Sequence, residues 1–73
     1  MKKTFKLVDL DCAHCAAKME DAINKIDGVQ HATVNFLAQK LIIEADDARF
    51  DQIVREAVKA CNKVEPDCEV IVK

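Results

Sequence analysis

The sequence predicts an α+β fold in which four strands form one antiparallel sheet and two helices cover one face of that sheet. Short stretches of alternating apolar residues predict the strands, and longer stretches with apolar residues at steps of three and four predict the helices. The stretches follow one another without a linker or a repeat. The chain has 73 residues, of which 51% are hydrophobic and 33% charged, so we expect a single ordered domain over residues 1–73.

The first expected strand covers residues 4–10, where Phe5 and Leu7 lie on one face. The first helix is expected from Cys15 onward, and Gly28 offers a residue that ends helices. The apolar positions of this helix are Ala16, Met19, Ile23 and Ile26.

A hairpin of two short strands is expected next. Apolar residues alternate within residues 29–36, and residues 41–43 form a second apolar stretch. The second helix is expected to follow a capping aspartate, Asp46 or Asp47, and to end before Pro66. Its apolar stripe consists of Phe50, Ile53, Val54, Ala57, Val58 and Cys61.

The last expected strand covers residues 68–72, where Cys68, Val70 and Val72 share one face. The order strand, helix, strand, strand, helix, strand is that of the ferredoxin-like βαββαβ sandwich. In this topology the loop after the first strand, the hairpin, and the turn before the last strand all lie at one end of the sheet. We therefore expect any site built from these loops to lie there.

Charge and hydropathy limit the partners of the chain. The formal net charge is −2 and the basic residues do not cluster, which argues against a nucleic-acid surface. No apolar stretch is long enough to span a bilayer, and the chain starts without the apolar segment of a signal peptide. We expect a cytoplasmic monomer whose four cysteines bind metal or carry out redox chemistry rather than form structural disulfides.

The loop after the first strand carries Cys12 and Cys15, whose spacing allows both sulfurs to bind one ion. Cys15 falls at the start of the expected helix, where the helix dipole favours thiolates, so lowered thiol pKa values are expected. Thiolates select zinc, cadmium, lead, mercury or cuprous ions. Asp11 adds an oxygen that suits divalent zinc or cadmium and offers little to Cu⁺.

The other cysteines and the histidine of the loop are secondary candidates as ligands. Cys61 and Cys68 continue apolar faces, which indicates core positions, although Cys68 is also a candidate fourth ligand. His14 stands between the two loop cysteines, and we expect its side chain to point away from them. With three protein ligands at most, the site is open to water or to a ligand from a partner, which suits metal transfer.

Several motifs together resemble the heavy-metal-associated domain. Residues 10–20 read LDCAHCAAKME and residues 27–29 read DGV, as in that family. Residues 34–36, 39–41 and 64–67 are similar to the amino-terminal domains of bacterial P-type ATPases that export cadmium and zinc. The resemblance covers the whole chain.

In that family the residues that match Cys12 and Cys15 bind the ion, and an acid at the position of Asp11 marks the zinc, cadmium and lead branch. Leu10 stands where copper relatives usually carry methionine, and Asp9 stands where glycine is common. The first departure favours a divalent ion over copper. The second departure, Asp9 in place of glycine, does not bear on the choice of metal but affects the backbone geometry expected for the loop.

The resemblance implies a module that binds Zn²⁺, Cd²⁺ or Pb²⁺ and passes the ion on by ligand exchange. Its expected partner is a membrane metal-transporting P-type ATPase, either in the same chain or as a separate protein, and no catalytic residues are expected. A free-standing chaperone of the same fold, carrying Cu⁺ or mercury, is the first alternative. A thiol-disulfide oxidoreductase is the second, although enzymes of that kind place a cis-proline beside the cysteines and continue into a further helix.

Overall fold

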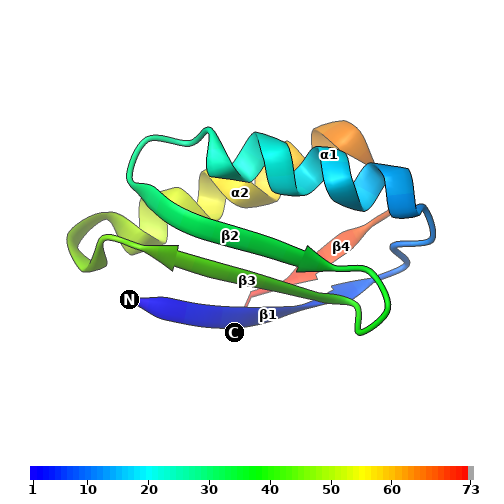
Figure 1. The fold of residues 1–73 in the computed structure, drawn as a ribbon, viewed down its shortest axis with the longest axis horizontal. Helices are drawn as coiled ribbons and strands as arrows, with labels where there is room; N and C mark the ends of the chain where they lie inside the picture. Colours follow the sequence, from blue (N-terminus) through cyan, green and yellow to red (C-terminus); the bar gives the residue numbers. More distant parts are fainter. Residues whose placement is uncertain (73) are drawn as a thin grey trace.

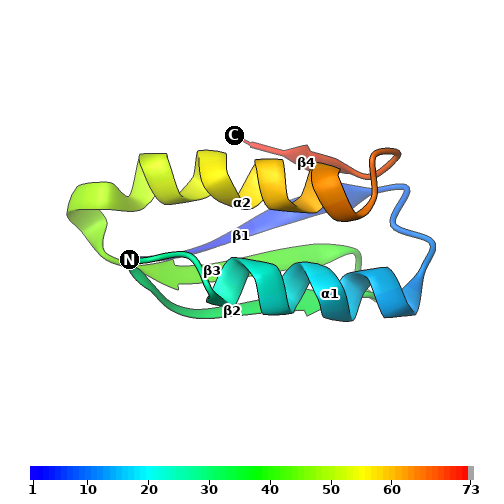
Figure 2. The ribbon, with the colours of Figure 1, turned by 90° about the horizontal axis from the view of Figure 1, so that it is seen from above.

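The computed structural model describes residues 1–72, and it contains one antiparallel sheet with two long helices on the same face (Figures 1 and 2). In chain order, the elements are β1 (Lys2–Val8), α1 (Ala13–Asn24), β2 (Val29–Asn35), β3 (Lys40–Ala45), the short 3₁₀ helix η1 (Asp47–Arg49), α2 (Phe50–Val64) and β4 (Glu69–Ile71). The ferredoxin-like α+β fold expected from the sequence is confirmed.

The strands are ordered β2-β3-β1-β4, and every neighbouring pair is antiparallel. Phe5 pairs with Leu41 of β3, and Leu7 pairs with Val70 of β4. Phe5, Leu7 and Leu41 are buried, so the two central strands, β1 and β3, form the sheet side of the hydrophobic core. The other buried apolar residues are Leu10, Ala16, Met19, Ile23, Ala32, Ile43, Ala45, Phe50, Ile53, Val54, Ala57, Cys61 and Cys68.

The strands differ from the predicted ones at their ends. β1 lies two residues earlier in the chain than the predicted range 4–10. It ends at Val8 because Asp9 has a φ of 63° and turns the chain out of the strand. β3 extends beyond 41–43 on both sides, since its pairing with β1 and β2 continues past its apolar centre. β2 and β4 are shorter than the predicted ranges 29–36 and 68–72.

Helix α1 begins at Ala13 rather than at Cys15, and it ends at Asn24, before Gly28. Cys12 is the residue that caps its first turn, a role that the sequence did not suggest because cysteine is outside the usual set of capping residues. The chain leaves the helix in a tightened turn, and Gly28 lies at the entrance of β2 instead of ending the helix.

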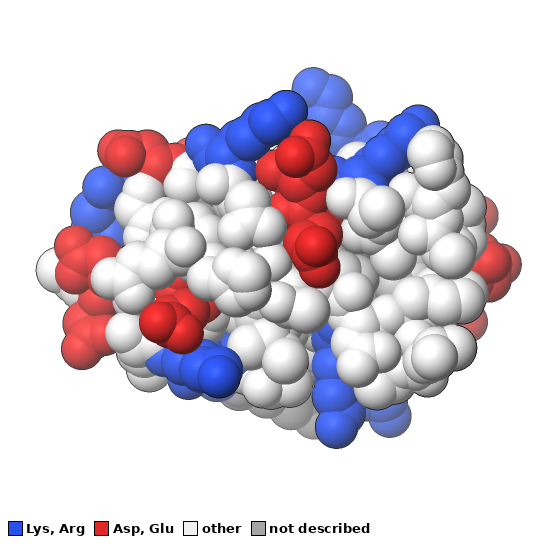
Figure 3. Space-filling model, viewed as in Figure 1, with Lys and Arg blue, Asp and Glu red and all other residues white. Residues whose placement is uncertain are grey.

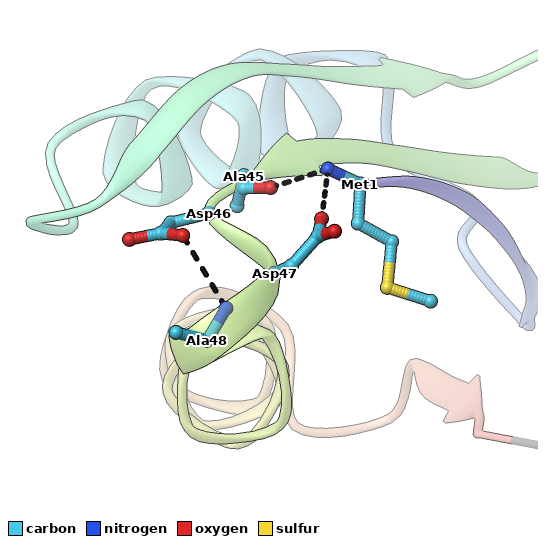
Figure 4. Close-up of polar contacts among 5 residues, drawn as sticks. All are labelled: Met1, Ala45, Asp46, Asp47 and Ala48. Carbon is cyan, nitrogen blue, oxygen red and sulfur yellow. Dashed lines mark hydrogen bonds and ion pairs between the residues drawn. The ribbon is translucent and has the colours of Figure 1, made fainter.

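The start of the chain is fastened between β3 and η1 (Figure 4). The ammonium group of Met1 lies 2.6 Å from Asp47 Oδ1 and donates a 2.7 Å hydrogen bond to the carbonyl oxygen of Ala45. Asp46, one of the two predicted caps, accepts a hydrogen bond of 3.3 Å from the Ala48 amide and so caps η1, which leads directly into α2. These contacts lie at the opposite end of the sheet from the Cys12 loop (Figure 1).

Two side chains of α1 fix this helix along the outer edge of β2. Asn24 Nδ2 donates to the Ala32 carbonyl at 2.9 Å, and the Ala32 amide donates to Asn24 Oδ1 at 2.8 Å. One turn earlier, Glu20 Oε1 accepts a 2.8 Å hydrogen bond from the Val34 amide. Helix α1 is therefore held in a defined register on the sheet, which sets the position of its first turn.

Acidic and basic side chains are scattered among uncharged ones on the face shown in Figure 3, and this face carries no large basic patch. Within residues 1–72, no helix combines the length and the apolar character needed to cross a membrane.

The turn between α1 and β2 depends on Gly28, whose φ is +97°. A Cβ atom at this position would lie 2.9 Å from Cδ1 of Ile53 and 3.4 Å from Nη1 of Arg49. Ile53 is fully buried, so it has little room to move aside. Both backbone conformation and space favour glycine here.

Replacing Gly28 by alanine is expected to lower the free energy of unfolding by about 2 kcal/mol, because alanine is strained at positive φ and its Cβ presses on Ile53. Urea unfolding followed by circular dichroism measures the change. Gly28→Asn is the comparison variant: its Cβ atom meets Ile53 as that of alanine does, but asparagine tolerates left-handed backbone better, so the difference between the two variants reports the backbone part of the cost. An alanine variant as stable as the unmodified protein would contradict this account of the turn.

Candidate metal centre

Cys12 and Cys15 lie together on the first turn of α1. Cys12 has extended backbone (φ −128°, ψ 111°), and its sulfur accepts a 3.2 Å hydrogen bond from the Cys15 amide. Its carbonyl oxygen accepts from the Ala16 amide at 3.0 Å, which begins the helix. Both thiols are half-buried. The two sulfurs thus lie on one side of a formed helical turn, as a shared ion requires.

The two thiols differ in acidity. A side-chain hydrogen bond from Cys15, joined by the Cys15 amide, lowers the pKa of Cys12. The same sulfur–sulfur hydrogen bond, followed by desolvation, raises the pKa of Cys15 to about 11. The expectation of lowered pKa values is therefore confirmed for Cys12 and wrong for Cys15. The reason is that a proton shared by two neighbouring thiols favours ionisation of one at the expense of the other.

Glu65 is a functional candidate that the sequence analysis missed. Its Oε2 atom lies 3.8 Å from the sulfur of Cys15. Glu65 ends α2, where its amide donates to the Cys61 carbonyl at 2.9 Å and its Oε1 accepts from the Asp67 amide at 3.3 Å. The topology predicts that the turn before β4 meets the loop between β1 and α1 (residues 9–12, called the metal loop below), and this was a signal for Glu65. Nothing in the sequence, however, distinguishes Glu65 from the neighbouring acids Asp67 and Glu69.

The other predicted ligands divide into an exposed pair and a buried pair. Asp11 and His14 are exposed, and His14 is the second residue of α1. Cys61 and Cys68 are buried core residues, as predicted, with 0% and 2% of their surface exposed. Burial raises the pKa of Cys61 to about 12 and also raises that of Cys68. Within residues 1–72, no three His, Cys, Asp or Glu side chains converge closely enough to form a ready-made cluster for an ion.

Three loops meet at the Cys12 end of the sheet, as the topology predicts. The Leu10 amide and carbonyl bond to the Gln39 side chain in the β2–β3 hairpin, and Cys15 meets Glu65 from the turn before β4. Asp9 occupies the left-handed region with a φ of 63°. This conformation explains why glycine suits that position, and aspartate is among the few residues that tolerate it.

A family model for the heavy-metal-associated domain matches residues 4–64 of the chain. The chain belongs to this family, and it is a metal-binding module rather than an enzyme. The oxidoreductase interpretation is therefore set aside.

Relatives include both chaperones and pumps. The chain is 31% identical over 71 residues to the copper chaperone CopZ of Enterococcus hirae, covering 97% of this chain and 100% of the relative. It is 30% identical over 70 residues to the cadmium, zinc and cobalt-transporting ATPase of Bacillus subtilis, covering 96% of this chain but only 10% of that ATPase. These relatives differ in the metal that they handle.

A solved structure agrees with the fold. The amino-terminal domain of a potential copper-translocating P-type ATPase from Bacillus subtilis, in the Cu(I)-loaded state, superimposes with a TM-score of 0.76 at 28% identity. The match covers 99% of this chain and 85% of that one. The chain is thus similar to metal-binding domains that occur in transporting ATPases.

Limited alkylation near neutral pH is expected to modify Cys12 before Cys15, because the thiolate is the reactive form. Cys61 and Cys68 should react only after unfolding, since they are buried. Peptide mass spectrometry over a time course with substoichiometric iodoacetamide measures the order.

A Cys15→Ala variant serves as the control for the cause of this order. It removes the sulfur donor and leaves the backbone amide, so the pKa of Cys12 should rise and its alkylation should slow. Faster reaction of Cys15 than of Cys12 in the unmodified protein would contradict the assigned direction of the hydrogen bonding.

Proposed function

We propose that this domain binds a divalent soft metal ion, Zn²⁺ or Cd²⁺ with Pb²⁺ as a further candidate, through Cys12, Cys15 and a carboxylate. The observation that carries the proposal is the carboxylate oxygen of Glu65 at 3.8 Å from the Cys15 sulfur. Asp11, directly before Cys12 in the chain, is the second candidate carboxylate. A pair of thiolates with an anionic oxygen suits zinc and cadmium better than Cu⁺, which two thiolates satisfy.

The proposed mechanism is ligand exchange without any covalent change in a substrate. Cys12 has the lowered pKa and binds the incoming ion first, and Cys15, with a pKa of about 11, must release its proton as it binds. Because protons compete with the ion, its affinity should rise with pH below that value. A thiolate or carboxylate of the recipient then displaces one cysteine at a time. The fourth position stays open for water or for a ligand from the partner, with Cys68 and His14 as secondary candidates.

We further propose that the recipient is a metal-transporting P-type ATPase on the cytoplasmic side of a membrane. Support comes from the matched ATPases, of which this chain covers 10% in the Bacillus subtilis case. The domain 1–73 acts either as part of such a pump or as a separate monomeric carrier that delivers to it.

The second candidate function is a free-standing copper chaperone. The observation that favours it is the match to CopZ, which this chain covers over the full length of the relative. Cys12 and Cys15 alone would then hold Cu⁺, and neither acid would take part. This candidate and the first predict different metal selectivity.

Titration of the reduced protein with Zn²⁺, Cd²⁺ and Cu⁺ in the presence of competing chelators separates the two candidates. We expect one equivalent of Cd²⁺ to bind, with thiolate-to-metal charge-transfer absorption in the ultraviolet, and Zn²⁺ to compete for the same site. Tight Cu⁺ binding with no measurable Zn²⁺ or Cd²⁺ binding would favour the chaperone.

Removing a carboxylate that binds the ion is expected to weaken Zn²⁺ and Cd²⁺ binding by about tenfold or more and to leave Cu⁺ affinity unchanged. The matched variants are Asp11→Asn and Glu65→Gln, which remove one charge each with little change in shape. Asp51→Asn, on an exposed residue in the first turn of α2, is the control. If neither variant changes the affinity for divalent ions, the proposed carboxylate ligand is wrong.

A further inference from the structure

The side chain of Gln39 forms a clamp between the β2–β3 hairpin and the metal loop. Gln39 Oε1 accepts a 3.0 Å hydrogen bond from the Leu10 amide, and Gln39 Nε2 donates to the Leu10 carbonyl at 2.6 Å. Nε2 also donates to the Phe36 carbonyl at 2.8 Å within the hairpin. The primary amide of one side chain thus holds both backbone polar groups of Leu10, in the way that a neighbouring strand would.

The backbone of Gln39 strengthens the same link. Its carbonyl oxygen accepts a 2.8 Å hydrogen bond from the amide of Leu7. Its φ of 54° lies in the left-handed region, where a residue other than glycine carries a conformational cost. Gln39 therefore binds the chain before and after Asp9, whose backbone is also left-handed with a φ of 63°. The turn at Asp9 is therefore held by hydrogen bonds to Gln39 on both sides, at Leu7 before it and at Leu10 after it.

The place of the clamp relative to the thiols gives it a functional consequence. Leu10 is buried, and a single residue, Asp11, separates it from Cys12. On the other side of Cys12, its carbonyl and its sulfur are fixed by the amides of α1. Cys12 is thus anchored two residues upstream by Gln39 and immediately downstream by the helix. Without the upstream anchor, residues 9–12 would have to be ordered when the ion binds.

We propose that Gln39 is a positioning residue that preorganises Cys12 for metal binding, and this inference rests on the function proposed for the Cys12 and Cys15 loop. Gln39 itself does not touch the ion. Its loss raises the dissociation constant because part of the binding free energy is then spent on ordering the loop. Groups that orient metal ligands typically change affinity by about 10- to 100-fold when they are removed.

The test uses two variants, Gln39→Gly and Gln39→Asn. Both residues suit the left-handed backbone at this position, so the hairpin turn is retained while the clamp is lost, because asparagine is one methylene shorter. We expect the dissociation constant for Cd²⁺ to rise by about tenfold in each variant. Chelator competition measures the affinity, and urea unfolding shows that the variants are folded at the assay conditions.

Asn35→Ala is the matched control. Asn35 Oδ1 accepts a 3.0 Å hydrogen bond from the Ala38 amide in the same hairpin, and within residues 1–72 this is a bond between two hairpin residues rather than one to the metal loop. Its removal should lower stability and leave the Cd²⁺ dissociation constant unchanged. A purely structural role for Gln39 would make its variants behave like this control.

Amide hydrogen exchange provides a readout that does not involve metal. The Leu10 amide should lose protection in both Gln39 variants and keep it in Asn35→Ala. Unchanged Cd²⁺ affinity or unchanged Leu10 protection in a folded Gln39 variant would overturn the inference. So would failure of both variants to fold, since Gln39 would then be required for folding itself. If the unmodified protein binds no Cd²⁺, the proposed function fails instead, and the exchange result still reports on the clamp.

Discussion

The attachment of α1 to the edge of β2 is the constraint on which the candidate metal centre depends. Asn24 and Glu20 bond to backbone groups of Ala32 and Val34, while the opposite side of the helix packs into the core through residues such as Met19. A shift of α1 along the sheet would break both sets of contacts together. The first turn of α1 is consequently fixed relative to the hairpin and to the end of α2. Because Cys12 and Cys15 lie at this turn, the positions of their thiols are fixed as well.

The same arrangement gives the two thiols different chemical roles. Cys12 stands outside the helix and accepts hydrogen bonds, whereas Cys15 stands inside it, beside a carboxylate. In the proposed ligand exchange, Cys12 is therefore the better nucleophile toward the metal ion, and Cys15 keeps its proton until the ion binds. An asymmetric pair suits stepwise exchange, because the two metal–sulfur bonds need not form or break at once.

The sequence predicted the architecture well because the architecture depends on local patterns, and the spacing of Cys12 and Cys15 was enough to make them candidate ligands. Alternation around Phe5 and Leu7 defines a strand, and the spacing of Met19 and Ile23 defines a helix. The role of Cys12 as a helix cap escaped prediction, since the preference of cysteine for that position is weak.

Two contacts at the site lay beyond sequence reasoning for a different reason. Glu65 meets Cys15 across 50 positions of the chain, and Gln39 meets Leu10 across 29. Such contacts depend on where α2 ends and on how the hairpin closes. If either boundary is predicted one residue too early or too late, a different side chain is expected at the contact. The order of elements predicted that these loops meet, but only the folded structure selects the residues that touch.

The hydrogen bonds from α1 to β2 also affect how this sheet can associate with other chains. An outer strand with unpaired amides and carbonyls is a template for strand addition and for aggregation. In β2, the Ala32 amide and carbonyl and the Val34 amide already have partners within the molecule. Along the part of the chain that the structure describes, β4 forms the other border of the sheet, and it spans only three residues. One helix therefore carries the two thiols at its beginning and, further along, occupies backbone groups of an outer strand that could otherwise pair with another chain.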